Sequence, residues 1–176
     1  MGFISFKGLF HAGVDGSMDP RQAGSGAVAA SPPKPSVQEG ALPQGALALR
    51  ILVVDDHPLN LKVLESFLQT YGLSADLAHS GEKALESHAQ AVYHVVFMDC
   101  HMPGMDGYEC TRRLRQNPRP GPRLTIIGVT ADAMDDNLRK CLAAGMDALL
   151  IKPIMEKELR ALLAKYAGQM PDGTGF

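Results

Sequence analysis

Four predicted strands of this sequence end in residues that could act together on an anion. Asp55 and Asp56 follow the apolar run ILVV, Asp99 follows HVVFM, Thr130 closes LTIIGVT and Lys152 follows ALLI. Carboxylates brought close together repel one another and take up protons unless a cation neutralises them, so the aspartates predict a divalent ion. Oxygen ligands favour Mg²⁺ over zinc. The lysine and the hydroxyl offer donors to a transferred anion, and phosphoryl transfer requires such positioning and charge neutralisation.

The elements that must position these residues alternate along the chain from Leu49 onward. Short apolar runs are followed by segments of helical period, and the runs are apolar throughout, which is typical of a parallel sheet covered by helices on both faces. Ser80 is the expected cap of the second helix. The predicted strands span 50–56, 73–78, 94–99, 124–131 and 148–152, and the predicted helices span 57–72, 80–91, 106–117, 132–145 and 155–167.

This alternation predicts a doubly wound α/β fold, and the flavodoxin-like strand order is favoured because it brings the polar strand ends together. We expect a doubly wound, five-stranded parallel sheet with strand order 2-1-3-4-5 and five helices. Ligands of such sheets bind beyond the carboxyl ends of the strands, where the strand order reverses. In this order the four strands with polar ends are neighbours, and the strand that ends in LAHSG lies outside them.

Composition excludes several classes of function. The chain has 176 residues and a formal net charge of -2 without a long basic run, which argues against nucleic-acid binding by this chain. No apolar run approaches the roughly 20 residues of a membrane helix, so no direct membrane insertion is expected. The three cysteines form no CxxC pair, which favours a reducing, cytoplasmic setting, with Cys100 a buried structural thiol.

The chain divides into one domain and two tails. Residues 1–48 are dominated by Gly, Ala, Ser, Pro and Gln and are predicted to be a disordered or linker-like arm. The first ten residues of this arm carry three Phe and suggest a short docking segment, although they fit a stray start equally well. Residues 49–168 form the predicted domain, and 169–176 are predicted to be a flexible C-terminal tail.

Four motifs, in order, resemble the receiver domain of two-component response regulators. They are ILVVDDHPLN, DCHMPGMDG, VTADA and LLIKPI, and the similarity covers about residues 50–168. The sequence is most similar in style to receivers of hybrid sensor histidine kinases. The resemblance implies that Asp99 is a phosphoacceptor that takes its phosphoryl group from a phosphohistidine. It also implies that Asp55, Asp56, Asp99 and the backbone carbonyl of His101 hold Mg²⁺.

The same resemblance assigns roles to the residues beyond the aspartates. Thr130 would bond a phosphoryl oxygen, Lys152 would pair with the phosphate, and the bond from Lys152 to Pro153 would be cis. The implied partners are a sensor histidine kinase, a histidine phosphotransfer domain, or both. Leu59 near the start of the first helix, with Asn60 beside it, is a candidate docking position, because a donor domain must approach the rim of Asp99; a lone exposed Leu is equally ordinary.

Other interpretations remain open at this level. Asp56 could simply cap the helix that starts near Pro58. His57 and His101, next to two aspartates, could belong to a metal-dependent hydrolase, although no HExxH spacing is present. An interaction module that needs no phosphorylation is disfavoured, because no member of the acidic pocket is missing.

One position departs from the family pattern. Leu149 stands three residues before Lys152, where many receivers carry a Tyr or Phe that swings inward on phosphorylation. No output region follows residue 168 in this sequence. Both features favour a phosphorelay receiver, and the alternative is a single-domain regulator that acts by binding a partner when phosphorylated. The stimulus, the cognate kinase and the downstream acceptor have no signature in the sequence.

Overall fold

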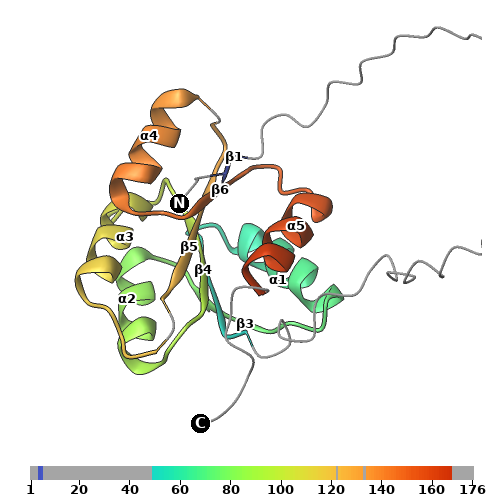
Figure 1. Ribbon diagram of the computed structural model, residues 1–176, viewed down its shortest axis with the longest axis horizontal. Coiled ribbons are helices and arrows are strands. Elements are labelled where there is room, and N and C mark those ends of the chain that lie inside the picture. Colours follow the sequence, from blue (N-terminus) through green and yellow to red (C-terminus); the bar gives the residue numbers. More distant parts are fainter. Residues whose placement is uncertain (1–3, 6–48, 122, 133, 168–176) are drawn as a thin grey trace, which may run out of the picture.

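The computed structural model of the chain describes residues 4–5, 49–121, 123–132 and 134–167 (Figure 1). Strands and helices alternate along the described domain. The strands are β1 Ile4–Ser5, β2 Ile51–Val54, β3 Ala75–Ala78, β4 Val95–Asp99, β5 Thr125–Thr130 and β6 Ala148–Ile151, and the helices are α1 Pro58–Thr70, α2 Gly81–Gln90, α3 Gly107–Gln116, α4 Asp135–Ala144 and α5 Glu156–Ala167.

All neighbouring strands are parallel, and their order is β1-β6-β5-β4-β2-β3. The five strands of the domain therefore have the predicted order 2-1-3-4-5, and the flavodoxin-like prediction is confirmed. The sequence did not predict β1, which adds a sixth strand beside β6. Figure 1 shows α1 and α5 on one face of the sheet and α2, α3 and α4 on the other.

The apolar core lies in two layers, one on each face of the sheet. Alternate strand residues point to opposite faces, so Val53 and Phe97 pack against α1 and α5, whereas Val54 and Met98 pack against α2, α3 and α4. The central strands β2, β4 and β5 thus bury both faces, which is why these three segments are predominantly apolar. Every residue of β2, β4 and β5 is buried. The polar residues at the carboxyl ends of these strands therefore lie at one edge of a rigid, packed sheet.

Helices α1, α2 and α3 begin at capping side chains near the polar edge. Ser80 Oγ accepts a hydrogen bond from the Lys83 amide at 3.2 Å, as predicted. The cap of α1 is His57, whose Nδ1 accepts from the Leu59 amide at 3.2 Å. The interpretation of Asp56 as the cap of this helix was therefore wrong, because an imidazole ring provides the acceptor there.

Helix α3 begins in close contact with the end of β4. A Cβ atom on Gly107 would lie 2.0 Å from the carbonyl oxygen of Asp99, far inside van der Waals contact with rigid backbone. The Gly107 amide donates to the carbonyl of Cys100 at 3.2 Å. Asp106 caps α3, since its Oδ1 accepts from the Glu109 amide at 2.7 Å. The turn after Asp99 is thus tied back onto the strand.

The predicted tail boundaries stay a prediction. Apart from Ile4–Ser5, most of the arm at 1–48 and the tail at 169–176 lie outside the described residues.

Helix α4 begins at Asp135, three positions later than the predicted start, and Gly145 ends it with φ at 95°. Across the part of the chain that the structure describes, no helix is both long and apolar enough to cross a bilayer.

Candidate functional site

The carboxyl ends of β2, β4, β5 and β6 bring the predicted site residues to one edge of the sheet. Asp55, Asp99 and Thr130 are buried there, with exposed fractions of 4%, 5% and 0%, and Asp56 is exposed at the rim. Asp99 is the last residue of β4, Cys100 after it is buried, and the loop reaches solvent at His101. Two buried carboxylates side by side require a cation or a proton for balance.

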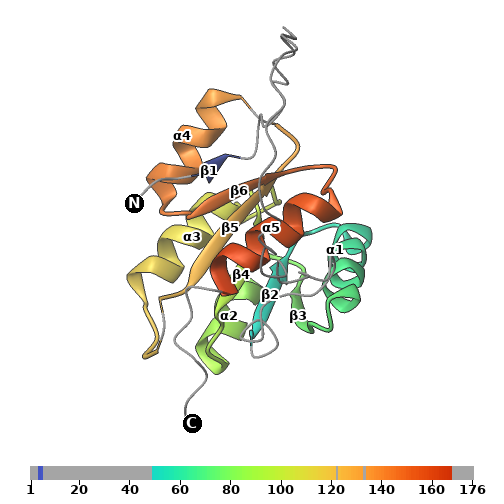
Figure 2. The same cartoon turned by 45° about the vertical axis from the view of Figure 1, so that its right-hand side comes forward.

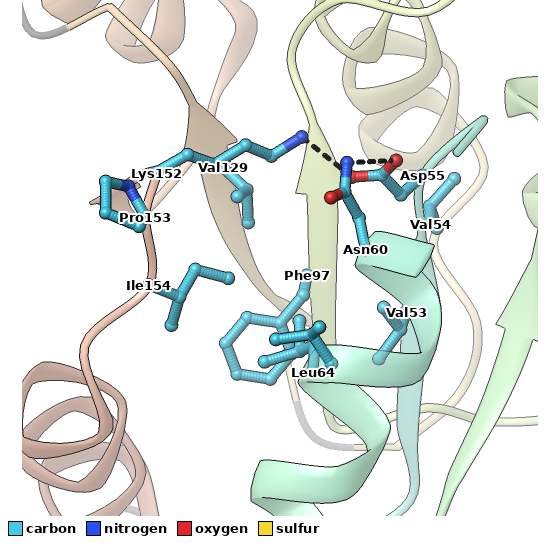
Figure 3. Close-up of a pocket in the computed structure, with 11 residues that line it drawn as sticks. Val53, Val54, Asp55, Asn60, Leu64, Phe97, Val129, Lys152, Pro153 and Ile154 are labelled. Carbon is cyan, nitrogen blue, oxygen red and sulfur yellow. Dashed lines mark hydrogen bonds and ion pairs between the residues drawn. The ribbon is translucent and has the colours of Figure 1, made fainter. Parts of the chain in front are cut away.

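A lysine supplies a cation to this pair. Lys152 Nζ lies 2.7 Å from Asp55 Oδ2 and 2.9 Å from Asp99 Oδ2 (Figure 3 shows its side chain reaching toward Asp55). The peptide bond from Lys152 to Pro153 is cis.

The remaining oxygens of the two buried carboxylates accept hydrogen bonds from nearby donors. Asp55 Oδ1 accepts from the His57 amide and from Asn60 Nδ2, each at 2.9 Å. Asp99 Oδ1 accepts from the His101 amide at 3.3 Å. Asn60, which the sequence suggested for partner docking, therefore directs its amide to Asp55 and orients that carboxylate (Figure 3).

The three aspartates can present oxygens to one ion. One carboxylate oxygen from each of Asp55, Asp56 and Asp99 lies within 4.8 Å of the others. The described residues hold no other comparable His, Cys, Asp or Glu group, and neither His57 nor His101 belongs to this one. An all-oxygen donor set of high negative charge fits Mg²⁺ and not a soft transition metal. The histidine-containing hydrolase site suggested by the sequence is therefore not assembled.

Burial and neighbouring charges shift the pKa values of two site residues, Asp99 and Lys152. Burial raises the pKa of Asp99; the hydrogen bond and charge of Lys152 oppose this, the charge of Asp55 adds to it, and the net shift is upward. Burial alone would lower the pKa of Lys152, but its hydrogen bonds to Asp55 and Asp99 and their charges outweigh burial, so its pKa is raised. The two acids therefore favour the charged form of Lys152, whereas burial and the charge of Asp55 disfavour the ionised form of Asp99.

Thr130 and Leu149 lie on the β5 and β6 side of the site. Thr130 is fully buried, and its Oγ1 accepts a hydrogen bond from the Asp132 amide at 3.2 Å. The residue before it, Val129, pairs with Asp99 in the sheet. Leu149 is 2% exposed and packs in the core layer toward α2, α3 and α4.

A hollow beside the acidic cluster was not foreseen from the sequence. It has a volume of about 450 Å³ and opens between α1 and the segment after β6, with Leu64 on one wall and Ile154 on the other (Figure 3). Val63 of α1 also lines it. Leu59 and Val63 are exposed on α1 at 64% and 42%. In the sequence, the apolar Ile154 after Pro153 was the available signal for this hollow. That Ile154 lies across the hollow from α1 follows from the fold and not from the sequence.

Together the geometry defines a phosphoacceptor-type site on a doubly wound sheet: a buried carboxylate, two further acids for a cation, and a lysine within reach. The chain matches the family model described as "Response regulator receiver domain" over residues 51–164. The chain therefore belongs to the response regulator receiver family, and the predicted resemblance is confirmed.

Curated relatives include a sensor histidine kinase and a virulence sensor protein. The chain is 40% identical over 119 residues to the sensor histidine kinase RcsC of Salmonella typhi, which covers 68% of this chain and 12% of that protein. It is 43% identical over 141 residues to the virulence sensor protein BvgS of Bordetella pertussis, covering 78% of this chain and 11% of that protein. The chain thus spans about a tenth of the length of these relatives.

Solved structures agree with this assignment. The receiver domain of the sensor histidine kinase PA1611 from Pseudomonas aeruginosa PAO1, solved with a magnesium ion in its active-site cleft, is 37% identical and has a TM-score of 0.63, covering 68% of this chain and 98% of that chain. The receiver domain of Ssk1, solved with the histidine phosphotransfer protein Ypd1 of Saccharomyces cerevisiae, is 25% identical with a TM-score of 0.64, covering 69% of this chain and 90% of that chain.

Proposed function

We propose that this chain accepts a phosphoryl group from a phosphohistidine onto Asp99 and passes it along a phosphorelay. The observation that carries the proposal is the contact of one lysine with two buried carboxylates, Lys152 with Asp55 and Asp99, at the carboxyl edge of the sheet. This arrangement offers Asp99 as a nucleophile and Lys152 as a cation that can pair with the transferred phosphoryl group. The chain acts in this proposal as a phosphoacceptor and not as an enzyme with a substrate of its own.

The proposed transfer forms one bond and breaks one bond. A carboxylate oxygen of Asp99 attacks phosphorus, the P–N bond of the phosphohistidine breaks, and its electron pair stays on the imidazole nitrogen, which then takes a proton from solvent. Lys152, already within 2.9 Å of Asp99, pairs with an oxygen of the arriving group. Thr130 provides a hydroxyl at the end of the neighbouring strand for another phosphoryl oxygen.

A divalent ion fits this site. Asp55, Asp56, Asp99 and the backbone carbonyl of His101 would hold Mg²⁺, which when bound neutralises charge on the transferred oxygens. The magnesium ion in the cleft of the PA1611 receiver supports this assignment. Asn60 keeps Asp55 oriented through its amide hydrogen bond.

The proposed partners are a sensor histidine kinase and a histidine phosphotransfer domain, in a cytoplasmic setting and without nucleic acid. The complex of Ypd1 with the Ssk1 receiver supports the second partner. We place the docking surface on α1, where Leu59 and Val63 are exposed beside the hollow that runs toward Ile154. An apolar patch next to the acceptor suits a helical donor that must bring its histidine close to Asp99.

The test is phosphoryl transfer measured with two donors. With Mg²⁺, acetyl phosphate is expected to place one acid-labile phosphoryl group on the chain, and Asp99→Asn is expected to abolish it. A phosphorylated histidine phosphotransfer domain is expected to label the same residue. Equal labelling of the Asp99→Asn variant would show that another residue is the acceptor.

A further inference from the structure

The two outer strands of the five-stranded domain sheet, β3 and β6, differ in charge and in burial. The β3 edge carries Asp76 and half-exposed side chains, and charges of this kind discourage pairing with other strands. The β6 edge reads Ala-Leu-Leu-Ile, carries no charge and is buried over Ala148–Leu150. An uncharged, apolar edge strand with free backbone groups is a template for another strand.

Residues Ile4–Ser5 cover part of this apolar edge. They run parallel to β6, with Ile4 opposite Ala148 and Ser5 opposite Leu149. Figures 1 and 2 both show β1 lying along β6 on the side where α4 packs. Within the described residues, the outer side of Leu150 and Ile151 has no strand partner.

We propose that the outer edge of β6 is a strand-addition site for an extended, uncharged segment, and that Ile4–Ser5 of the same chain occupies it. Residues 3–6 read Phe-Ile-Ser-Phe, which has the aromatic and β-branched composition of strands. In strand addition the main-chain hydrogen bonds supply the binding, so a short uncharged segment suffices when it is tethered. The connection through residues 6–50 supplies that tether by raising the local concentration.

The site adjoins the phosphoacceptor machinery through β6 itself. The strand that receives Ile4–Ser5 leads directly into Lys152, whose Nζ contacts Asp55 and Asp99. A paired β6 has fewer open conformations than a free edge strand. Within the described residues, the pairing joins Ile4 to Ala148 and Ser5 to Leu149.

Amide exchange of single residues tests the pairing in the full chain. In the double variant Ile4→Pro/Ser5→Pro, proline removes the backbone donors of β1 and bends the segment away from strand geometry. We expect the amides within Ala148–Leu150 that face β1 to exchange at least tenfold faster. The amides of Val95–Met98 in β4 serve as an internal reference, and their exchange is expected to stay unchanged. The matched control Ala29→Pro/Ala30→Pro places the same two prolines in the connecting segment and is expected to behave as the parent.

Two further measurements separate the occupants of the edge. Protection of β6 that does not change on tenfold dilution, in a monomeric chain, supports occupation by the same chain. Protection that disappears on dilution together with a dimer would assign the edge to the N-terminal segment of a second copy and overturn the proposal as stated. Equal β6 exchange in the proline variant and the parent would overturn strand addition altogether. A peptide of residues 1–8, added to the proline variant, is expected to restore protection, whereas a scrambled peptide is not.

Discussion

Lys152 Nζ stands 2.9 Å from Asp99 Oδ2, and the same nitrogen stands 2.7 Å from Asp55 Oδ2. One ammonium group thus compensates two buried carboxylates from neighbouring strands. A cation that belongs to the chain itself therefore balances part of the charge of the two acids.

Removing this cation is expected to destabilise the metal-free fold. Lys152→Met leaves Asp55 and Asp99 buried without their partner, and breaking a partly buried ion pair is expected to lower the free energy of unfolding by about 2 kcal/mol. Chemical denaturation in EDTA measures this loss. Because the crowded acids then depend on an added cation, Mg²⁺ should stabilise Lys152→Met more than the parent. A variant as stable as the parent without metal would show that the lysine contact is weak.

Neutralising the acceptor is expected to have the opposite effect. The raised pKa of Asp99 means that its ionised form costs stability in the fold, so Asp99→Asn should raise the free energy of unfolding in EDTA at pH 7, by about 1 kcal/mol. The gain should shrink as the pH falls through the raised pKa of the folded carboxyl group, and it should vanish below the ordinary aspartate pKa of about 3.9, where the parent carboxylate is protonated in both states. Denaturation at pH 7 and at pH 3.5 checks this, and a gain that grows on acidification would reverse the sign.

Metal binding is expected to depend on the exposed acid at the rim. The parent should gain stability with Mg²⁺ as RT ln(1 + [L]/Kd), and Asp56→Asn should lose most of that gain. Thermal unfolding across a Mg²⁺ series measures the effect, with the exposed Asp135→Asn on α4 as a matched control that keeps the full response. If Asp56→Asn responds to Mg²⁺ as the parent does, Asp56 is not a ligand.

Sequence patterns predicted the sheet order and the clustering of Asp55, Asp99 and Lys152. The hydrophobic period and the polar residues at strand ends are local signals in the sequence. Because parallel strands share one carboxyl edge, these strand ends meet in the fold. They assigned Asn60 to partner docking, although its amide hydrogen-bonds Asp55, a contact that depends on how the first turn of α1 sits on β2. The pairing of β1 with β6 joins segments far apart in the sequence, and nothing in Ile4–Ser5 alone specifies a partner strand.

Transfer from a protein donor is expected to depend on Leu59. This side chain is 64% exposed at the start of α1, so Leu59→Lys should leave folding and acetyl phosphate labelling intact. The charged side chain would disturb an apolar contact with the donor, and transfer from a histidine phosphotransfer domain should slow by about tenfold, about 1.4 kcal/mol. Leu142→Lys on α4, at a 46% exposed position, is the matched control and should not slow transfer. Equal slowing with both donors would instead place Leu59 in the acceptor site or the core.

Acid sensitivity of the fold is expected to arise partly from His88, at the far end of α2 from the acceptor. Burial lowers the pKa of His88; the carbonyl of Asn117 opposes this, and the charge of Arg119 adds to the lowering. The folded chain therefore binds this proton less well than the unfolded chain does. Its contribution to stability is present above the unfolded pKa of about 6.5 and is lost as the pH falls below it, at up to about 1.4 kcal/mol per pH unit.

The variant His88→Gln is expected to flatten this dependence. Urea denaturation between pH 7.5 and pH 5.5 should show a smaller loss of stability in His88→Gln than in the parent, whatever its stability at pH 7.5. Some slope should remain, because burial also lowers the pKa of His94. The exposed His79 gives a control, since His79→Gln changes a ring that water surrounds in both states and should keep the parental slope. A His88→Gln profile parallel to that of the parent would assign the acid loss to other groups.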